Sequence, residues 1–399
     1  MKPIPSVRVL HVTAGLARQQ GGPALNAVGI ARCIRRAGGW NEIFSTDNRE
    51  PASSRIHTRI TRHDLPREAA NLDVCLFRTQ RPYRVMYSPD LGAALKLRAS
   101  EFDVLHIHSL FLYPQFAAFR AARRHRLPYV VTIHGCLDPA LRHRSRTAKG
   151  VTEALWQRRM LDQASFIHYT TEEERSLAAD MSFAAPTIVI PNGIDLREFW
   201  PAALADATLE PRRPRTVLYV GRISHKKGLD ILIEAFAKLQ RSRGDVRLVV
   251  AGPDDEGLTQ SLREKGAALG MADHVEFPGL LDATERLAAL KSAAVWVLPS
   301  KTENFGTGVI EAMAMGVPVV ISSAVNLAPE IAAAGAGLVV PRDPNAIADA
   351  VAGVLSDDEE HARLGAAGRA FASAYDWDLI APRLLAMYQA AAWRRELAA

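Results

Sequence analysis

The chain of 399 residues has only three cysteines, Cys33, Cys75 and Cys136. Their spacing fits neither a disulfide framework nor a structural zinc site, so we expect reduced and mostly buried thiols. The chain also lacks a run of about 18 apolar residues that could span a bilayer. Its first residues lack the apolar core of a signal peptide. Together these absences favour a cytoplasmic protein.

Two common nucleotide-binding motifs are also missing. The chain has no G-x-x-x-x-G-K-[ST] loop, and no G-x-G-x-x-G follows the first expected strand, which disfavours an ATPase or a dinucleotide-binding enzyme. Low-complexity tracts are absent as well. With 48% hydrophobic and 23% charged residues, the composition is that of an ordinary globular protein.

The pattern along the chain predicts two α/β domains, because 399 residues exceed what one hydrophobic core usually supports. Strand and helix signals alternate, which favours parallel sheets covered by helices. Strands are expected at 7–12, 104–107, 129–133, 166–169 and 187–190, and again at 216–221, 246–251, 275–277, 293–298, 317–321 and 338–340. The proline-rich segment 199–214 reads as a linker. We therefore expect domains at 1–198 and 199–375, with a last helix in 376–399 returning to the first.

Positive charge is concentrated in the first half of the chain. The stretch 116–160 holds ten basic residues and two acidic ones, a net charge of +8, while the whole chain carries +6. The basic residues are Arg120, Arg123, Arg124, Arg126, Arg142, Arg144, Arg146, Lys149, Arg158 and Arg159. Such a patch attracts phosphates on an anionic membrane leaflet, a lipid pyrophosphate or nucleic acid, or is simply a solvated surface. Of these partners we expect the membrane surface, and no nucleic acid.

Two acids flank a loop of small residues in the second half. Glu303 follows the apolar strand 293–298, so it lies at the strand's carboxyl end, where open α/β sheets bind ligands. Glu311 stands eight positions later, one turn inside the next helix. Free N–H groups at that helix start attract anions. The alternative is structural, because acids near a helix start also stabilise the helix dipole.

A basic loop follows the first strand of the second half. Arg222 and Lys227 stand within Gly221-Arg222-Ile223-Ser224-His225-Lys226-Lys227-Gly228. An arginine fork and a lysine point charge suit a diphosphate, and a leaving nucleoside diphosphate gains charge as its bond breaks. A solvated loop is the alternative explanation for this segment.

Several motifs in this order resemble the retaining glycosyltransferases of family 4, also called group 1, which have the GT-B fold. The resemblance rests on the E-x7-E pair at Glu303 and Glu311, on the basic loop, and on Pro191-Asn192-Gly193-Ile194-Asp195, which matches the family's interdomain connection. Two further segments resemble a subgroup that builds exopolysaccharide or lipopolysaccharide. They are Ile133-His134-Gly135-Cys136-Leu137-Asp138-Pro139 and Gly21-Gly22-Pro23.

The resemblance implies two Rossmann-like domains facing across a cleft, with the donor, a nucleotide sugar, bound by the second. Glu303 would hold sugar hydroxyls and Glu311 the ribose hydroxyls, while backbone N–H groups of the loop reach the sugar and phosphates. The implied donor-binding residues are Gly21, Gly22, Arg222, Lys227, Glu303, Asn304, Phe305, Gly306, Thr307, Gly308 and Glu311. The implied catalytic residues are Glu303, His134, Arg222 and Lys227.

The implied reaction moves a hexose, with retention of configuration, to a glycan or polyprenyl-diphosphate-linked acceptor on the inner face of the cytoplasmic membrane. Arg222 and Lys227 would replace a divalent metal, so we expect no metal or other cofactor. His134 would position the reacting sugar, or make a structural hydrogen bond. His108, which shares a strand face with His106, and Asp138, which also fits turn chemistry, are expected on the acceptor side.

Two alternatives share the expected fold and ligand. One is a nonhydrolysing sugar-nucleotide epimerase, and the other is a catalytically inactive subunit that binds the nucleotide sugar. Two departures from the family pattern bear on the choice of donor or acceptor. Asn304 stands where many members have glycine, and Pro23 stands where others have an acid.

Overall fold

The computed structural model describes residues 7–17, 21–48, 57–142, 152–199, 215–254 and 256–398. The chain divides into two compact units, one of Met1–Gly193 with Trp377–Ala399 and the other of Ile194–Asp376. The sequence analysis placed these divisions at 198 and 375. Residues 200–214 of the expected linker lie outside the described residues.

The first unit is built on a seven-stranded parallel sheet with the order β3-β2-β1-β4-β5-β6-β7. Its strands are β1 (Arg8–Thr13), β2 (Trp40–Thr46), β3 (Val74–Phe77), β4 (Val104–His108), β5 (Tyr129–Thr132), β6 (Phe166–Tyr169) and β7 (Thr187–Val189). The strand order reverses between β1 and β4, which is where doubly wound sheets open a crevice at the carboxyl ends of their strands. The sequence analysis did not predict β2 and β3.

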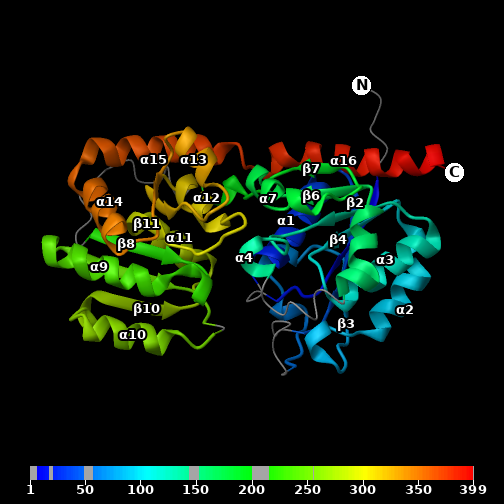
Figure 1. Ribbon diagram of the computed structural model, residues 1–399, viewed down its shortest axis with the longest axis horizontal. Helices are drawn as coiled ribbons and strands as arrows, with labels where there is room; N and C mark the ends of the chain where they lie inside the picture. The colour runs from blue at the N-terminus through cyan, green and yellow to red at the C-terminus, as the bar shows by residue number, and fades with distance from the viewer. Residues whose placement is uncertain are drawn as a thin grey trace. The chain divides into compact units, whose positions relative to one another are not determined.

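Helices cover both faces of this sheet (Figure 1). They are α1 (Gly22–Arg36), α2 (Pro89–Arg98), α3 (Tyr113–His125), α4 (Pro139–Arg142), α6 (Arg158–Asp162), α7 (Glu172–Leu177) and α16 (Trp377–Ala398). The last helix packs against α1 and shares its core cluster with strands β1, β4 and β5. Trp377 begins α16 and fills the space that a side chain on Gly29 or Gly193 would occupy. The expected return of the C-terminal helix to the first domain is confirmed.

The second unit has a six-stranded parallel sheet with the order β10-β9-β8-β11-β12-β13. Its strands are β8 (Arg215–Val220), β9 (Val246–Ala251), β10 (Val275–Gly279), β11 (Ala293–Leu298), β12 (Val319–Ser322) and β13 (Leu338–Val340). Its helices are α9 (Leu229–Arg243), α10 (Thr259–Ala268), α11 (Ala283–Ser292), α12 (Thr307–Ala314), α13 (Ala328–Ala333), α14 (Pro344–Ser356) and α15 (Asp358–Ser373). Here the order reverses between β8 and β11.

All three cysteines lie within the described residues, and none forms a disulfide. Cys33 is buried in α1, and burial raises its pKa to about 12, so it stays protonated and unreactive. Cys75 and Cys136 are only half-buried, so the expectation of mostly buried thiols holds for one cysteine of the three.

Candidate functional site

The basic loop leaves the carboxyl end of β8 and is pressed against the end of β11. It runs through a short 3₁₀ turn, His225–Lys227, into Gly228, which has φ +67° and precedes α9. A side chain on Gly228 would overlap the carbonyl oxygen of Pro299, which follows β11. Glycine is therefore needed both for the left-handed backbone and for the close approach. Lys227 is brought to the place where β11 ends.

The loop after β11 is anchored to the loop after β12. The N–H of Glu303 donates to the Ala324 carbonyl over 3.0 Å, and the Glu303 carbonyl accepts from the N–H of Asn326 over 2.9 Å. Gly306, with φ +76°, then turns the chain into α12. A side chain on Gly308 would lie 3.1 Å from the Trp296 ring, so glycine lets the first turn of α12 sit close to the sheet.

Glu303 and Lys227 form an ion pair in which the lysine Nζ donates to Oε2 of the carboxylate. The side chain of Glu303 is 12% exposed and that of Lys227 is 13% exposed, so water screens the pair only weakly. Lys226 Nζ lies 3.8 Å from the same oxygen. Burial by itself raises the pKa of Glu303, but Lys227, Lys226 and Arg222 outweigh it and lower that pKa to about 2. Glu303 is an ionised acceptor at neutral pH.

The second predicted acid pairs with an arginine that the sequence analysis did not single out. Oε1 of Glu311 on α12 accepts a hydrogen bond of 2.6 Å from Arg286 on α11. Their side chains are 15% and 24% exposed. Glu311 stands one turn inside α12, as predicted, and it too is presented as an oriented carboxylate.

This edge of the second unit places a carboxylate, which can accept hydrogen bonds from hydroxyl groups, beside several positively charged side chains. Glu303, Lys227 and Arg222 lie in the two loops that flank the β8/β11 switch point, where sheets of this type bind ligands. At the start of α12 the N–H of Val309 donates to the Gly306 carbonyl over 2.8 Å, and the N–H groups of Thr307 and Gly308 precede it, at the end of a helix that favours an anion or a sugar oxygen. Asn304 and Asn326 approach each other over 3.5 Å in the same loops.

The predicted residues of the first unit stand on separate segments. Gly21 has φ +75° and precedes α1, and among the described residues nothing lies within 4 Å of a side chain placed on Gly22. His134 follows β5 in a left-handed conformation with φ +53°. Asp138 makes a local turn, because its Oδ1 accepts the N–H of Ala140 over 2.8 Å.

His108, which was expected on the acceptor side, is fully buried, with 0% exposure. Its Nδ1 lies 3.1 Å from Nε2 of His134 and its Nε2 lies 3.1 Å from Nδ1 of His11. The expectation that His108 lies on the acceptor side stays a prediction, and its ring contacts His134, which follows β5.

Glu174 holds the loop that follows β5, and the sequence analysis did not single it out. It lies on α7, is 4% exposed, and its carboxylate accepts the N–H of Gly135 over 2.6 Å and the N–H of Thr170 over 2.6 Å. It thereby fixes the loop that carries His134. The acidic run Glu172-Glu173-Glu174 at a helix start was visible in the sequence, but nothing local marks its third member as buried.

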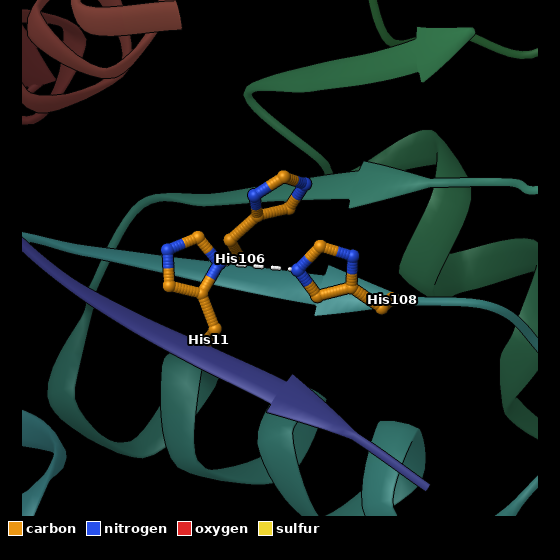
Figure 2. A group of neighbouring side chains, drawn as sticks. All are labelled: His11, His106 and His108. Atoms are coloured by element: carbon orange, nitrogen blue, oxygen red, sulfur yellow. Dashed lines mark hydrogen bonds between the residues drawn. The ribbon is translucent and has the colours of Figure 1, made fainter. Parts of the chain in front are cut away.

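One group of side chains has the composition of a metal site. The rings of His11, His106 and His108 each offer a nitrogen, and these atoms lie within 4.8 Å of one another in the core of the first unit (Figure 2). However, His106 already uses both nitrogens, one with the hydroxyl of Tyr388 over 2.7 Å and one with Oγ1 of Thr132 over 2.5 Å. His108 also uses both nitrogens, one with His11 and one with His134, which leaves only Nε2 of His11 for an ion, too few ligands for a structural zinc site.

The basic stretch 116–160 is partly described. Arg120 and Arg123 of α3 lie over the rings of Phe116 and Phe119, with 5.7 and 5.9 Å between the guanidinium carbon and the ring centre. Arg158 pairs with Asp162 over 2.7 Å. Three of the ten basic residues, Arg144, Arg146 and Lys149, lie outside the described residues. Within the described ranges, every helix is too short or too polar to cross a membrane.

Comparison with known proteins covers both units. The model of the family "Glycosyl transferases group 1" matches residues 203–371, and that of the "Glycosyl transferase 4-like domain" matches residues 21–193. The phosphatidyl-myo-inositol mannosyltransferase of Mycolicibacterium smegmatis is 30% identical over 318 residues, covering 77% of this chain and 76% of that protein. The D-inositol 3-phosphate glycosyltransferase of Nocardia farcinica is 30% identical over 306 residues, covering 73% and 67%.

Among solved structures, Anabaena HepE in complex with UDP and glucose superposes with a TM-score of 0.76. Its sequence is 19% identical, and the match covers 96% of this chain and all of that chain. This likeness shows the fold, two Rossmann-like α/β domains of the GT-B type, as predicted. The chain belongs to the group 1, family 4 glycosyltransferases and is a glycosyltransferase of GT-B fold.

Proposed function

We propose that this glycosyltransferase moves a hexose or hexose derivative from a nucleoside-diphosphate sugar to a lipid-linked glycan acceptor in cell-surface polysaccharide synthesis, with retention of configuration and without a metal. The observation that carries the proposal is the cluster of Glu303, Lys227, Lys226 and Arg222 at the β8/β11 switch point. A sugar diphosphate needs both halves of this cluster, a carboxylate for its hydroxyls and cations for its phosphates.

In the bound state, Glu303 accepts hydrogen bonds from hydroxyls of the transferred sugar. The ammonium of Lys227 has three N–H donors, so it can donate to the diphosphate while it keeps its hydrogen bond to Glu303. Arg222 supplies a second cation from the same loop. Glu311, oriented by Arg286, accepts from the ribose hydroxyls. The first turn of α12 donates its N–H groups to the sugar and phosphates.

The reaction then requires no nucleophile from the protein. The acceptor hydroxyl oxygen forms a bond to the anomeric carbon on the same face from which the bond to the diphosphate oxygen breaks, and the leaving phosphate takes the hydroxyl proton. Lys227 and Arg222 stabilise the charge that builds on the diphosphate as this bond breaks, which is the role a divalent cation fills in other transferases. The acids are therefore hydroxyl clamps rather than the acid and nucleophile of a glycosidase.

The first unit is proposed to bind the acceptor, with His134 beside the reacting sugar and the stretch 116–160 on an anionic membrane surface. Two of the relatives are named for inositol-containing acceptors, a phosphatidyl-myo-inositol and an inositol phosphate. Both names combine a polyol with a phosphate. An acceptor whose sugar is attached to a lipid phosphate is consistent with these names and with the basic stretch.

A binding and turnover experiment tests the proposal. The purified protein is screened by thermal shift against UDP-, GDP- and ADP-sugars, since a ligand of the folded state raises its apparent stability. The donor found is then incubated in EDTA with lipid-linked acceptors, including phosphatidylinositol. We expect transfer in EDTA. Sugar isomerisation without an acceptor would identify an epimerase, and binding without any turnover would identify an inactive subunit. Activity lost in EDTA and restored by magnesium would contradict metal independence.

A further inference from the structure

Five buried or half-buried histidines of the first unit take part in two separate hydrogen-bond chains. The first hydrogen-bond chain contains His168 and His106, and the second contains His11, His108 and His134. In the first, only one direction of proton donation is possible. Nε2 of His168 lies 2.8 Å from the carbonyl oxygen of Ile190, which can only accept, so this nitrogen carries the proton. Its Nδ1 must then accept from the hydroxyl of Thr132 over 2.8 Å. Thr132 Oγ1 in turn accepts from Nε2–H of His106, and Nδ1 of His106 accepts from the hydroxyl of Tyr388.

The second chain runs from His11 through His108 to His134 and has two conceivable directions. Its inner end is Nε2 of His11, which is buried without a hydrogen-bond partner among the described residues. Its outer end is Nδ1 of His134, a half-buried residue for which no described residue supplies a partner to this atom. If the protons pointed inward, a buried N–H would have no acceptor. If they point outward, the inner end is a bare lone pair, which proteins tolerate more often than an orphaned N–H.

The outward direction fixes the tautomer of every ring in the chain. His11 donates from Nδ1 to Nε2 of His108, and His108 donates from Nδ1 to Nε2 of His134, each over 3.1 Å. His134 is then left with its proton on Nδ1, at the accessible end of the chain. The backbone supports this placement. Glu174 accepts the N–H of Gly135, and His134 is kept at φ +53°, a backbone conformation that residues other than glycine rarely adopt.

We propose that His11 and His108 are positioning residues that hold His134 as the Nδ1–H tautomer, so that His134 donates a hydrogen bond to a hydroxyl oxygen of a bound sugar. The proposal rests on the proposed function of this site. Burial lowers the pKa of His134 and of His11 to about 3, so both rings stay neutral at physiological pH. His134 therefore acts as an oriented neutral donor, and the chain does not deliver a proton to the reaction.

The direct test reads the tautomers without any substrate. The full-length protein is prepared with ¹⁵N-labelled histidine, and its ring nitrogens are observed by long-range ¹H–¹⁵N NMR. Each histidine is assigned from the signal that disappears when that histidine is substituted. We expect Nδ1–H on His11, His108 and His134, and Nε2–H on His106 and His168. An Nε2–H tautomer on His134 overturns the proposal. So does one equivalent of tightly bound metal in the purified protein, which would make the cluster a metal site.

Variants then connect the tautomer to turnover. In His11→Asn the amide retains a donor near the Nδ1 position, whereas His11→Phe keeps the ring shape but cannot donate. We expect His11→Phe to shift His134 toward the Nε2–H tautomer and to lower kcat about tenfold, the usual effect of losing one hydrogen bond, while His11→Asn restores most of both. The matched control is His168→Phe, in the other chain of the same core, which should leave the His134 tautomer unchanged.

The tautomer measurement and the turnover measurement together distinguish the positioning of His134 by His11 and His108, here called the histidine relay, from the proposed transferase function. If no donor is ever turned over, the tautomer pattern still confirms or overturns the relay. If transfer is observed but His11→Phe and His168→Phe alter the tautomer and kcat equally, the histidines are only packing, and the proposed function stands without the relay.

Discussion

Replacing Glu303 by glutamine separates donor binding from donor turnover. In the ligand-free protein, Glu303 neutralises part of the charge of Lys227, and Lys226 lies 3.8 Å from the same oxygen. Glutamine keeps the shape of the side chain and its ability to accept a hydrogen bond, but it removes the negative charge. A diphosphate placed on the far side of the Lys227 ammonium would then no longer be repelled by the carboxylate.

The size of this effect follows from the geometry. A phosphate oxygen that contacts Lys227 would lie two hydrogen-bond lengths from the Glu303 carboxylate, about 5 to 6 Å away. At an effective dielectric constant near 20, unit charges at that separation repel by about 3 kcal/mol. Solvent in the open site reduces this to about 1 to 2 kcal/mol, so we expect free nucleoside diphosphate to bind about 5 to 30 times more tightly to Glu303→Gln.

Turnover should move in the opposite direction. The ionised carboxylate makes stronger hydrogen bonds to sugar hydroxyls than an amide does, and losing that difference costs about 1 to 1.5 kcal/mol for each bond, or about five- to thirteenfold in kcat. Calorimetric titration with nucleoside diphosphate and a steady-state transfer assay measure the two effects. The matched control is Glu276→Gln, which makes the same charge change at a side chain that is 57% exposed on edge strand β10. Weaker diphosphate binding or unchanged kcat in Glu303→Gln would refute the reasoning.

Three further predictions concern the diphosphate loop, the backbone beneath it and the histidine core. Lys227→Ala should weaken nucleoside diphosphate binding at least about tenfold by calorimetry, and an unchanged Kd would count against the loop. Gly252→Ala should lower the free energy of unfolding in urea by at least about 2 kcal/mol, since the new methyl would overlap the Gly221 carbonyl; wild-type stability would contradict that packing. Because the folded pKa values of His11 and His134 are about 3 against an ordinary 6.5, their stabilising contribution is complete above pH 6.5 and is lost as the pH falls toward 3. At pH 5 each of the two histidines should lower the free energy of unfolding by about 2 kcal/mol, which is measured as a lower thermal midpoint. A midpoint that did not fall between pH 7.5 and pH 5 would show that the rings are not buried and neutral.

The alternation of apolar strands and amphipathic helices made most of the fold predictable. The two strands that were not predicted, β2 and β3, show where prediction from the sequence pattern fails. Strand β2 has the sequence Trp40-Asn41-Glu42-Ile43-Phe44-Ser45-Thr46, whose polar residues break the apolar run that marks a buried parallel strand. These polar groups are buried because distant residues satisfy them. Asn41 donates to the Ala31 carbonyl over 2.9 Å, and Arg98 on α2 donates to Glu42 over 2.7 Å.

The site divides in the same way between local and distant contacts. Glu303, Lys227 and the glycines of their loops could be predicted, because motif spacing places them at strand ends. Arg286 and Glu174 could not, because each acts on a residue far along the chain, Arg286 on Glu311 25 positions later and Glu174 on Gly135 39 positions earlier. The burial of His108 was not predicted for a similar reason, since its ring contacts His11, 97 positions earlier in the sequence, and His134, 26 positions later.

The anomeric configuration of the product tests the central claim most directly. The protein is incubated in EDTA with the nucleotide sugar that it binds and a lipid-linked acceptor, and the new glycosidic bond is read from the coupling constant of its anomeric proton by NMR. The account predicts a product with the same anomeric configuration as the donor. An inverted product, or transfer that appears only when a divalent metal is added, would contradict it.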